Sequence, residues 1–161
     1  MIKLRIPIKY HNQNCKIESH GDWIDLKSAE KVSFSKVWDF KIISLGVSMK
    51  LPKYYQANLI PRSSTFKKFG LIQSNHMGVI DGPTKTSPGY CGNDDIWGFA
   101  AISGRRTTIN EGDRICQFEI RPTMRAPWWV KLKWLFVSNI IFVEVDKLDT
   151  ENRGGFGSTN Q

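Results

Sequence analysis

The nine residues RICQFEIRP (114–122) decide the fold class of this chain. Apolar and polar side chains alternate along the stretch, and successive side chains of a strand point to opposite faces. The apolar set is Cys116, Phe118 and Ile120, and the polar set is Gln117, Glu119 and Arg121. We therefore expect a half-buried β-strand in which Gln117 points away from the core.

Short apolar runs of the same kind recur on both sides of this strand. They are KIISLGVSM (41–49), YQANLI (55–60), GFAAI (98–102) and IIFVEV (140–145), and the N-terminal MIKLRIPIKY also reads as a strand. Glycines and prolines separate the runs throughout. Such a pattern is typical of an all-β sandwich, barrel or jelly roll.

One segment, APWWVKLKWLFVSN (126–139), departs from the strand pattern. At helical spacing its large apolar residues share one face, and Pro127 suits the first helical position. These residues are Trp128, Trp129, Leu132, Leu135 and Phe136. We expect a short amphipathic helix at about 126–138 that packs onto the domain. A strand is the alternative, and attachment to a membrane surface or a protein partner is a second role for the same face.

Length and charge limit the remaining choices. The 161 residues suffice for one domain, which we expect over 1–148, followed by an arm over 149–161 that is too rich in glycine and small polar residues to hold itself in place. A formal charge of +8 indicates either an anionic partner or merely a basic surface. Without interleaved aromatic and basic residues, specific nucleic-acid binding is not expected.

Cysteine and histidine show no spacing that indicates a metal or disulfide site. Three cysteines cannot all pair, they lack a CxxC pattern, and the three histidines lack an HxxxH pattern. We expect a protein of the reducing cytoplasm, without a signal peptide or transmembrane segment. No GxxxxGK or GxGxxG loop is present, so a nucleotide would be held by another device.

Three stretches carry candidate chemistry. Arg62, Ser63 and Ser64 follow Pro61, and an arginine beside two hydroxyls suits phosphate oxygens, although an ordinary loop reads the same way. Asp81 follows the apolar GVI and could deprotonate water, or simply form a turn. Asp25 could hold Mg²⁺ or its waters, or cap a turn.

Taken in order, these stretches resemble the five motifs of the trimeric dUTPase family. The matching segments are DLKSA (25–29), PRSSTFKKFGL (61–71), NHMGVID (75–81) with YCGND (90–94), GDRICQFEI (112–120) and RGGFGSTN (153–160). The resemblance implies a distorted jelly roll of the β-clip type, a homotrimer, and hydrolysis of dUTP to dUMP and pyrophosphate. It also implies that the arm closes a neighbouring subunit's active site.

The resemblance assigns roles residue by residue. Asp81 is expected to be the general base, and Asp25 to position Mg²⁺ through water. The phosphates are expected to contact Arg62, Ser63, Ser64 and Gln117, and the arm residues Arg153, Gly157, Ser158 and Thr159 to close upon them. Uracil is expected to be read by Asn75 and the main chain of Val79 and Ile80, and covered by Phe156.

Three features depart from the family pattern. GPTKTSPG (82–89) separates Asp81 from Tyr90, so Tyr90 can pack against the deoxyribose only if these residues bulge outward. The arm is compact, with Arg153 directly before GGFG and Asn160 in place of the usual glycine, and PWWVKLKWLF (127–136) is not part of the family pattern.

Two further readings stay open. One is a dCTP deaminase-like enzyme of the same fold. That chemistry requires a glutamate after the third motif, where this sequence has YCGNDD (90–95). The other is a nucleotide-switched regulatory protein whose tryptophan-rich insert binds a protein partner.

Overall fold

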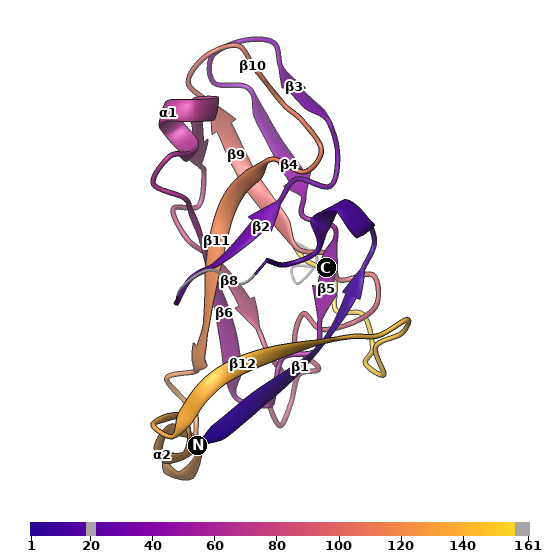
Figure 1. Ribbon diagram of the computed structural model, residues 1–161, viewed down its shortest axis with the longest axis vertical. Coiled ribbons are helices and arrows are strands. Elements are labelled where there is room, and N and C mark those ends of the chain that lie inside the picture. Colours follow the sequence, from indigo (N-terminus) through magenta and orange to yellow (C-terminus); the bar gives the residue numbers. More distant parts are fainter. Residues whose placement is uncertain (19–21, 157–161) are drawn as a thin grey trace.

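The apolar runs form β-strands that pair in separate small sheets, as the computed structural model shows for residues 1–18 and 22–156 (Figure 1). The first sheet has the order β12 (Val137–Glu144), β1 (Ile2–Tyr10), β5 (Val47–Met49). The second has the order β2 (Ile24–Lys27), β11 (Arg114–Pro122), β6 (Tyr55–Pro61), β8 (Gly78–Asp81). The third is β4 (Phe40–Ser44), β9 (Gly98–Ser103), β7 (Leu71–Gln73), and the fourth pairs β10 (Thr107–Ile109) with β3 (Val32–Phe34).

Helices are few and short. They are the 3₁₀ turn η1 (Gln13–Cys15), α1 (Thr65–Phe69) and α2 (Trp128–Trp134). The all-β, jelly-roll-like prediction is confirmed, because each predicted apolar run forms one or two strands over most of its length and the helices only connect strands. Within the described residues, no helix has the length and apolar character needed to span a membrane.

Strand β11 is a central strand, as its alternating sequence predicts. It pairs antiparallel with both β2 and β6. Cys116, Phe118 and Ile120 are buried on one face, whereas Gln117 is only partly buried on the other. The predicted orientation of Gln117 is therefore confirmed.

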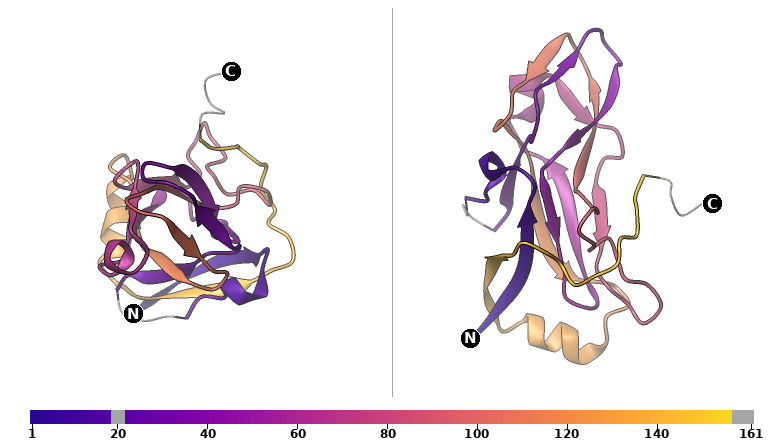
Figure 2. Two further views of the ribbon diagram at one scale, coloured as in Figure 1. Left: turned by 90° about the horizontal axis from the view of Figure 1, so that it is seen from above. Right: turned by 90° about the vertical axis from the view of Figure 1, so that its right-hand side faces the viewer.

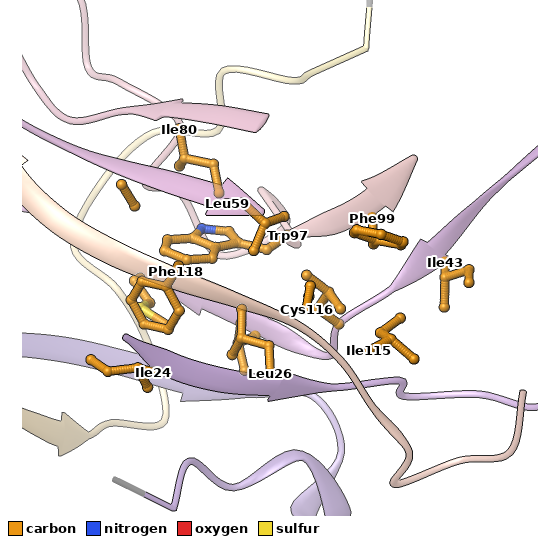
Figure 3. Packing of buried hydrophobic residues seen from close by; sticks show 14 of the residues in the cluster. Ile24, Leu26, Ile43, Leu59, Ile80, Trp97, Phe99, Ile115, Cys116 and Phe118 are labelled. Atoms are coloured by element: carbon orange, nitrogen blue, oxygen red, sulfur yellow. The ribbon is translucent and has the colours of Figure 1, made fainter. Parts of the chain in front are cut away.

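The core is aromatic at its centre. Phe118 lies between Trp97 and Phe142 in edge-on contacts, with ring centroids 5.1 Å and 6.0 Å apart respectively. Figure 3 shows Trp97 and Phe118 among the aliphatic core residues Leu26, Leu59 and Ile80. Edge-on pairs of this kind stabilise beyond the area that they bury.

The segment 126–138 is only partly helical, and its packing differs from the prediction. Helix α2 begins after Pro127 and ends at Trp134, and the chain enters β12 at Val137. Trp134 and Val130 pack against the core, and Trp134 meets Tyr55 with a ring-centroid distance of 5.7 Å. The predicted packing face is exposed instead, from 47% at Leu132 to 76% at Leu135.

This difference has a geometric cause. A helix of seven residues makes only about two turns, which is too few to place the whole predicted apolar face on the domain. Helix α2 also lies at one end of the molecule's long axis, opposite β3 and β10 (Figures 1 and 2). The prediction that Trp128, Trp129, Leu132, Leu135 and Phe136 pack onto the domain is therefore wrong.

The parallel pairing of β1 with β12 positions the C-terminal segment. Ile8 pairs with Glu144, and Val145 N–H then donates to Ile8 O at 2.9 Å. The chain that follows β12 thus starts from a fixed point of the same subunit.

Candidate active site

Strand β8, the loop after it and the C-terminal segment line a pocket of about 260 Å³. We call it the Asp81 pocket. Seven of the predicted site residues line it: Asn75, Val79, Ile80, Asp81, Tyr90, Arg153 and Phe156. The fold thus gathers parts of the third and fifth motifs, which lie far apart in the sequence.

Asp81 ends β8, which is the edge strand of its sheet and pairs with β6. Its carboxylate is half-exposed, with 51% of the side chain accessible, so it can meet both water and substrate. Arg153 Nη1 donates to Asp81 Oδ2 at 2.9 Å. A cation from the arm therefore lies directly at the predicted base.

Tyr90 reaches the pocket because residues 82–89 bulge outward. Tyr90 N–H donates to Asp81 O at 2.8 Å, which closes the neck of the loop. Gly89 has φ +73°, and a Cβ there would lie 2.5 Å from the carbonyl carbon of Gly82, so only glycine fits. The geometric condition for Tyr90 to stand beside Asp81 is met.

The phenol of Tyr90 is held in place by a hydrogen bond to the main chain of the following loop. Its hydroxyl donates to Ile96 O at 2.8 Å, and burial raises the pKa of this phenol, with nearby Asp95 adding to the effect. The ring is therefore a neutral, fixed wall of the pocket.

The described part of the arm lies against the pocket of its own chain. Arg153, Gly154, Gly155 and Phe156 all line it, and Phe156 is 58% exposed. The predicted contacts of Gly157, Ser158 and Thr159 lie outside the described residues. Closure of a neighbouring subunit's site stays a prediction.

The other predicted phosphate contacts form a separate group, which we call the Asp25 cluster. Asp25 of β2 lies opposite Gln117 of β11 in register. Arg62 Nε donates to Asp25 Oδ1 at 2.8 Å, and Arg114 Nη1 donates to Asp25 Oδ2 at 3.5 Å. Motifs one, two and four thus meet here, away from the residues that line the Asp81 pocket.

The buried side chain of Thr65 holds the turn that carries Arg62. Arg62 N–H donates to Thr65 Oγ1 at 2.9 Å, and Thr65 Oγ1 donates to Ile115 O at 2.7 Å. Ser63 is exposed beside Arg62 in a second depression, and Ser64 precedes α1 as its N-cap residue. Two cations, hydroxyls and an amide are therefore presented together, which suits phosphate oxygens.

The Asp25 cluster fits a metal only through water. Both Asp25 oxygens accept from arginines, and no group of three His, Cys, Asp or Glu residues forms a metal cage in the described part of the chain. Mg²⁺ commonly keeps several waters and binds substrate phosphates with one or two carboxylates. Asp25 fits the water-mediated role predicted for it.

The cysteines take no part in the site. All three are free and buried. Burial raises the pKa of the Cys91 thiol to about 11 and raises the pKa of Cys116 well above its ordinary value. Neither thiol is an activated nucleophile.

Sequence reasoning missed four residues beside the pocket. Trp97 is fully buried and contributes to its wall, and Asn93, Asp94 and Asp95 bond the segment that leads to Arg153. The only sequence signal was the run of polar residues after Gly92 in YCGNDD.

The sequence of residues 14–126 matches the family model described as dUTPase. Over 160 residues the chain is 44% identical to the SPbeta prophage-derived deoxyuridine 5'-triphosphate nucleotidohydrolase of Bacillus subtilis, covering 97% of this chain and 98% of that protein. It is 29% identical over 162 residues to the deoxyuridine 5'-triphosphate nucleotidohydrolase of Finegoldia magna, covering 98% and 99% of the two chains.

Solved structures share the fold. The dUTPase of Streptococcus mutans superposes with a TM-score of 0.61 at 24% identity, over 73% of this chain and 93% of that one. A mutant dUTPase of phage phi11 of S. aureus, whose structure describes coordination of a structural Mg(II) ion, gives 0.59 at 20% identity, over 76% and 93%.

Proposed function

This chain belongs to the dUTPase family, and we propose that its Asp81 pocket is where dUTP is hydrolysed to dUMP and pyrophosphate. The activity itself is that of a dUTP diphosphatase, an enzyme of nucleotide metabolism. One observation carries the assignment of the site. A half-exposed carboxylate, an aromatic wall and an arginine come together from residues 75–98 and 153–156 in a pocket of nucleoside size.

Asp81 acts as the general base. Its carboxylate accepts a proton from water, and the resulting hydroxide attacks the α-phosphorus while pyrophosphate leaves with the bonding electron pair. Arg153, which bonds Asp81 before substrate binds, turns to the phosphate oxygens, because a triphosphate carries more negative charge than one carboxylate.

The edge of β8 reads the uracil. An edge strand has main-chain N–H and C=O groups free on its outer side, and Val79 and Ile80 of this strand line the pocket together with Asn75. Uracil and cytosine present opposite donor and acceptor patterns, so cytosine would leave buried polar groups unpaired. Tyr90 packs against the deoxyribose, and Phe156 covers the base.

The Asp25 cluster supplies the phosphate contacts from another copy of the chain. Arg62, Ser63, Ser64 and Gln117 lie in or beside this cluster, whereas Asp81 lies in the other pocket. Each chain then carries two half-sites, and a homotrimer would join the Asp81 pocket of one subunit to the Asp25 cluster of the next. Gel filtration with light scattering would contradict this by giving an active monomer.

Mg²⁺ would be held by the substrate phosphates, with Asp25 bonding its waters. When bound, the ion neutralises the triphosphate and polarises its oxygens. We also propose a cytoplasmic location, which the three unpaired, buried thiols support.

The test is a panel of nucleotides with Mg²⁺. We expect pyrophosphate and dUMP from dUTP, and little turnover of dCTP, dTTP or UTP. Formation of a uracil nucleotide from dCTP would favour the deaminase-like alternative, and absence of pyrophosphate from dUTP would overturn the proposed function.

A second function, binding of a protein partner through α2, is favoured by the exposure of its apolar face. Trp128 and Trp129 are 71% and 59% exposed. Substituting both by serine should abolish partner binding in a pull-down and leave dUTP turnover unchanged. A partner retained by the double variant would count against this role.

A further inference from the structure

Helix α2 and the two residues after it expose five large apolar side chains, which we call the α2 patch. Trp128, Trp129, Leu132, Leu135 and Phe136 are exposed by 71%, 59%, 47%, 76% and 60% respectively. The rings of Trp128 and Trp129 meet edge-on, with centroids 6.0 Å apart. Single exposed apolar residues are ordinary in proteins, whereas a group of them on one short segment indicates a binding surface.

The α2 patch lies at one end of the molecule. Figures 1 and 2 show α2 at the end of the long axis, and Figure 1 shows the N-terminus beside it. Ile2 N–H donates to Phe136 O at 2.8 Å, which joins the start of β1 to the end of the patch. The Asp81 pocket is lined by other residues. A flat surface can therefore approach α2 along the long axis of the molecule.

The charge of this end has one sign along the sequence. Residues 1–17, which include β1, and residues 120–143, which include α2, contain no aspartate or glutamate. Lys131 and Lys133 belong to α2, and Lys3 and Arg5 to β1, and all four side chains are exposed. The α2 patch thus has cations on its own segment and on the strand that starts beside it.

Exposure of α2 suits either a protein partner or a membrane, and the charge distinguishes the two. Tryptophan, leucine and phenylalanine beside lysines form the pattern with which amphipathic segments lie at the boundary of lipid headgroups and acyl chains. Cations next to such a segment are attracted to anionic headgroups. The position of α2 at the end of the molecule also matches a flat partner better than an enclosing one.

We propose that the α2 patch binds an anionic lipid bilayer, with Trp128 and Trp129 at the level of the headgroups and Lys131 and Lys133 beside the lipid phosphates. Lys3 and Arg5 add attraction from the same end of the molecule. The proposal goes beyond dUTP hydrolysis and does not depend on it. Binding of a protein by the same surface is the other outcome of the test.

Flotation with vesicles tests which occupant the surface takes. The wild-type protein is mixed with vesicles of phosphatidylcholine alone or of equal phosphatidylcholine and phosphatidylglycerol. We expect binding to the anionic vesicles to be at least about tenfold tighter, and to weaken between about 0.1 M and about 0.5 M salt. Equal binding to both vesicle types would overturn the proposal. Binding to neither type would also overturn it and would leave the surface to a protein partner.

Substitution of the two tryptophans tests the apolar contribution. Trp128→Ser with Trp129→Ser should weaken binding to the anionic vesicles at least about tenfold, because both side chains lose their contact with lipid. Trp38→Ser is the matched control, since Trp38 is 74% exposed and lies between β3 and β4, away from α2. An equal loss in the control, or unchanged binding in the double variant, would contradict the proposal.

Substitution of the two lysines tests the charge. Each cation near an anionic surface contributes about fivefold in affinity, so Lys131→Ala with Lys133→Ala should weaken binding about 25-fold. Lys36→Ala with Lys41→Ala removes the same charge near β3 and β4, and should change binding less than about threefold. Equal effects of the two pairs would show that net charge alone attracts the lipid, and would refute a role for the α2 patch.

Fluorescence tests whether the tryptophans enter the bilayer. Lipids brominated in their acyl chains should quench the emission of the wild-type protein, and should quench the Trp128→Ser, Trp129→Ser variant much less. Absence of quenching at saturating anionic vesicles would overturn the proposed position of the two rings. All four variants are expected to keep wild-type dUTP turnover. Failure of the wild-type protein to hydrolyse dUTP would refute the proposed function instead, and the vesicle result would stand by itself.

Discussion

Replacing Asp81 by asparagine tests the chemical assignment most directly. Asparagine keeps the shape of the side chain and can still accept a hydrogen bond from Arg153, but it cannot take a proton from water. General-base catalysis contributes about 10²- to 10⁴-fold. We expect kcat to fall by that factor, which is about 3–5 kcal/mol in activation free energy.

The structure predicts that the fold will tolerate this change. The Asp81–Arg153 pair is 2.9 Å long, but the two side chains are 51% and 29% exposed, and a pair so open to solvent contributes at most about 1 kcal/mol. The pairing of β8 with β6 uses main-chain groups, which the substitution leaves in place. The melting temperature should therefore change by no more than about 4 °C.

Turnover would be followed by pyrophosphate release, with binding of a nonhydrolysable dUTP analogue measured by calorimetry. Binding within about threefold of wild type, together with the loss of kcat, would locate the defect in chemistry. Exposed Asp149→Asn serves as the control for loss of a carboxylate elsewhere. A variant with unchanged stability that keeps more than about a tenth of wild-type kcat would refute Asp81 as the base.

Three further substitutions or treatments probe the rest of the molecule. Tyr90→Phe loses the 2.8 Å hydrogen bond to Ile96 O, so the free energy of unfolding in urea titrations should fall by about 1 kcal/mol. The ring stays, so most of the affinity for dUTP should be retained. A large loss of affinity would mean that the hydroxyl contacts substrate. Phe118→Ala removes a fully buried ring and should cost about 3–5 kcal/mol, and a cost below about 1 kcal/mol would contradict the packing described. At pH 8 little of the Cys91 thiol is thiolate, because its pKa is about 11. Alkylation of Cys91 by iodoacetamide, followed by peptide mass spectrometry, should therefore be about 100-fold slower in the folded protein than in urea. Equal rates would show that the Cys91 thiol is accessible in the folded protein.

Much of the fold could be predicted from the sequence because the relevant signals are local. Alternation in residues 114–122 follows from strand geometry alone, and β11 has the predicted faces. The α2 segment shows the limit of this reasoning. Its periodicity predicted a helix correctly, but which side packs depends on where the chain re-enters β12, and periodicity carries no information on that.

The candidate site divides in the same way. The residue types of the Asp81 pocket and of the Asp25 cluster could be chosen from the sequence, since a base, an arginine fork and hydroxyls are recognisable in short motifs. That Tyr90 returns to Asp81 across residues 82–89 depends on the main-chain bond from Tyr90 to Asp81 and on the close approach of Gly89 to Gly82, which strand alternation does not predict. The bonds of Asn93, Asp94 and Asp95 to the segment after β12 could not be predicted, because Leu148, Asn152 and Arg153 lie more than fifty residues away.

The sequence by itself determined the strand pattern, the family resemblance and the chemical groups at work, because hydrophobic alternation and motif order are properties of neighbouring residues. Only the tertiary structure decided that the predicted site divides into two separate groups in one chain, that α2 exposes Trp128 and Trp129, and that residues 153–156 lie against the Asp81 pocket. Those outcomes depend on buried hydrogen bonds and packing between segments distant in sequence, whose energies no local pattern records.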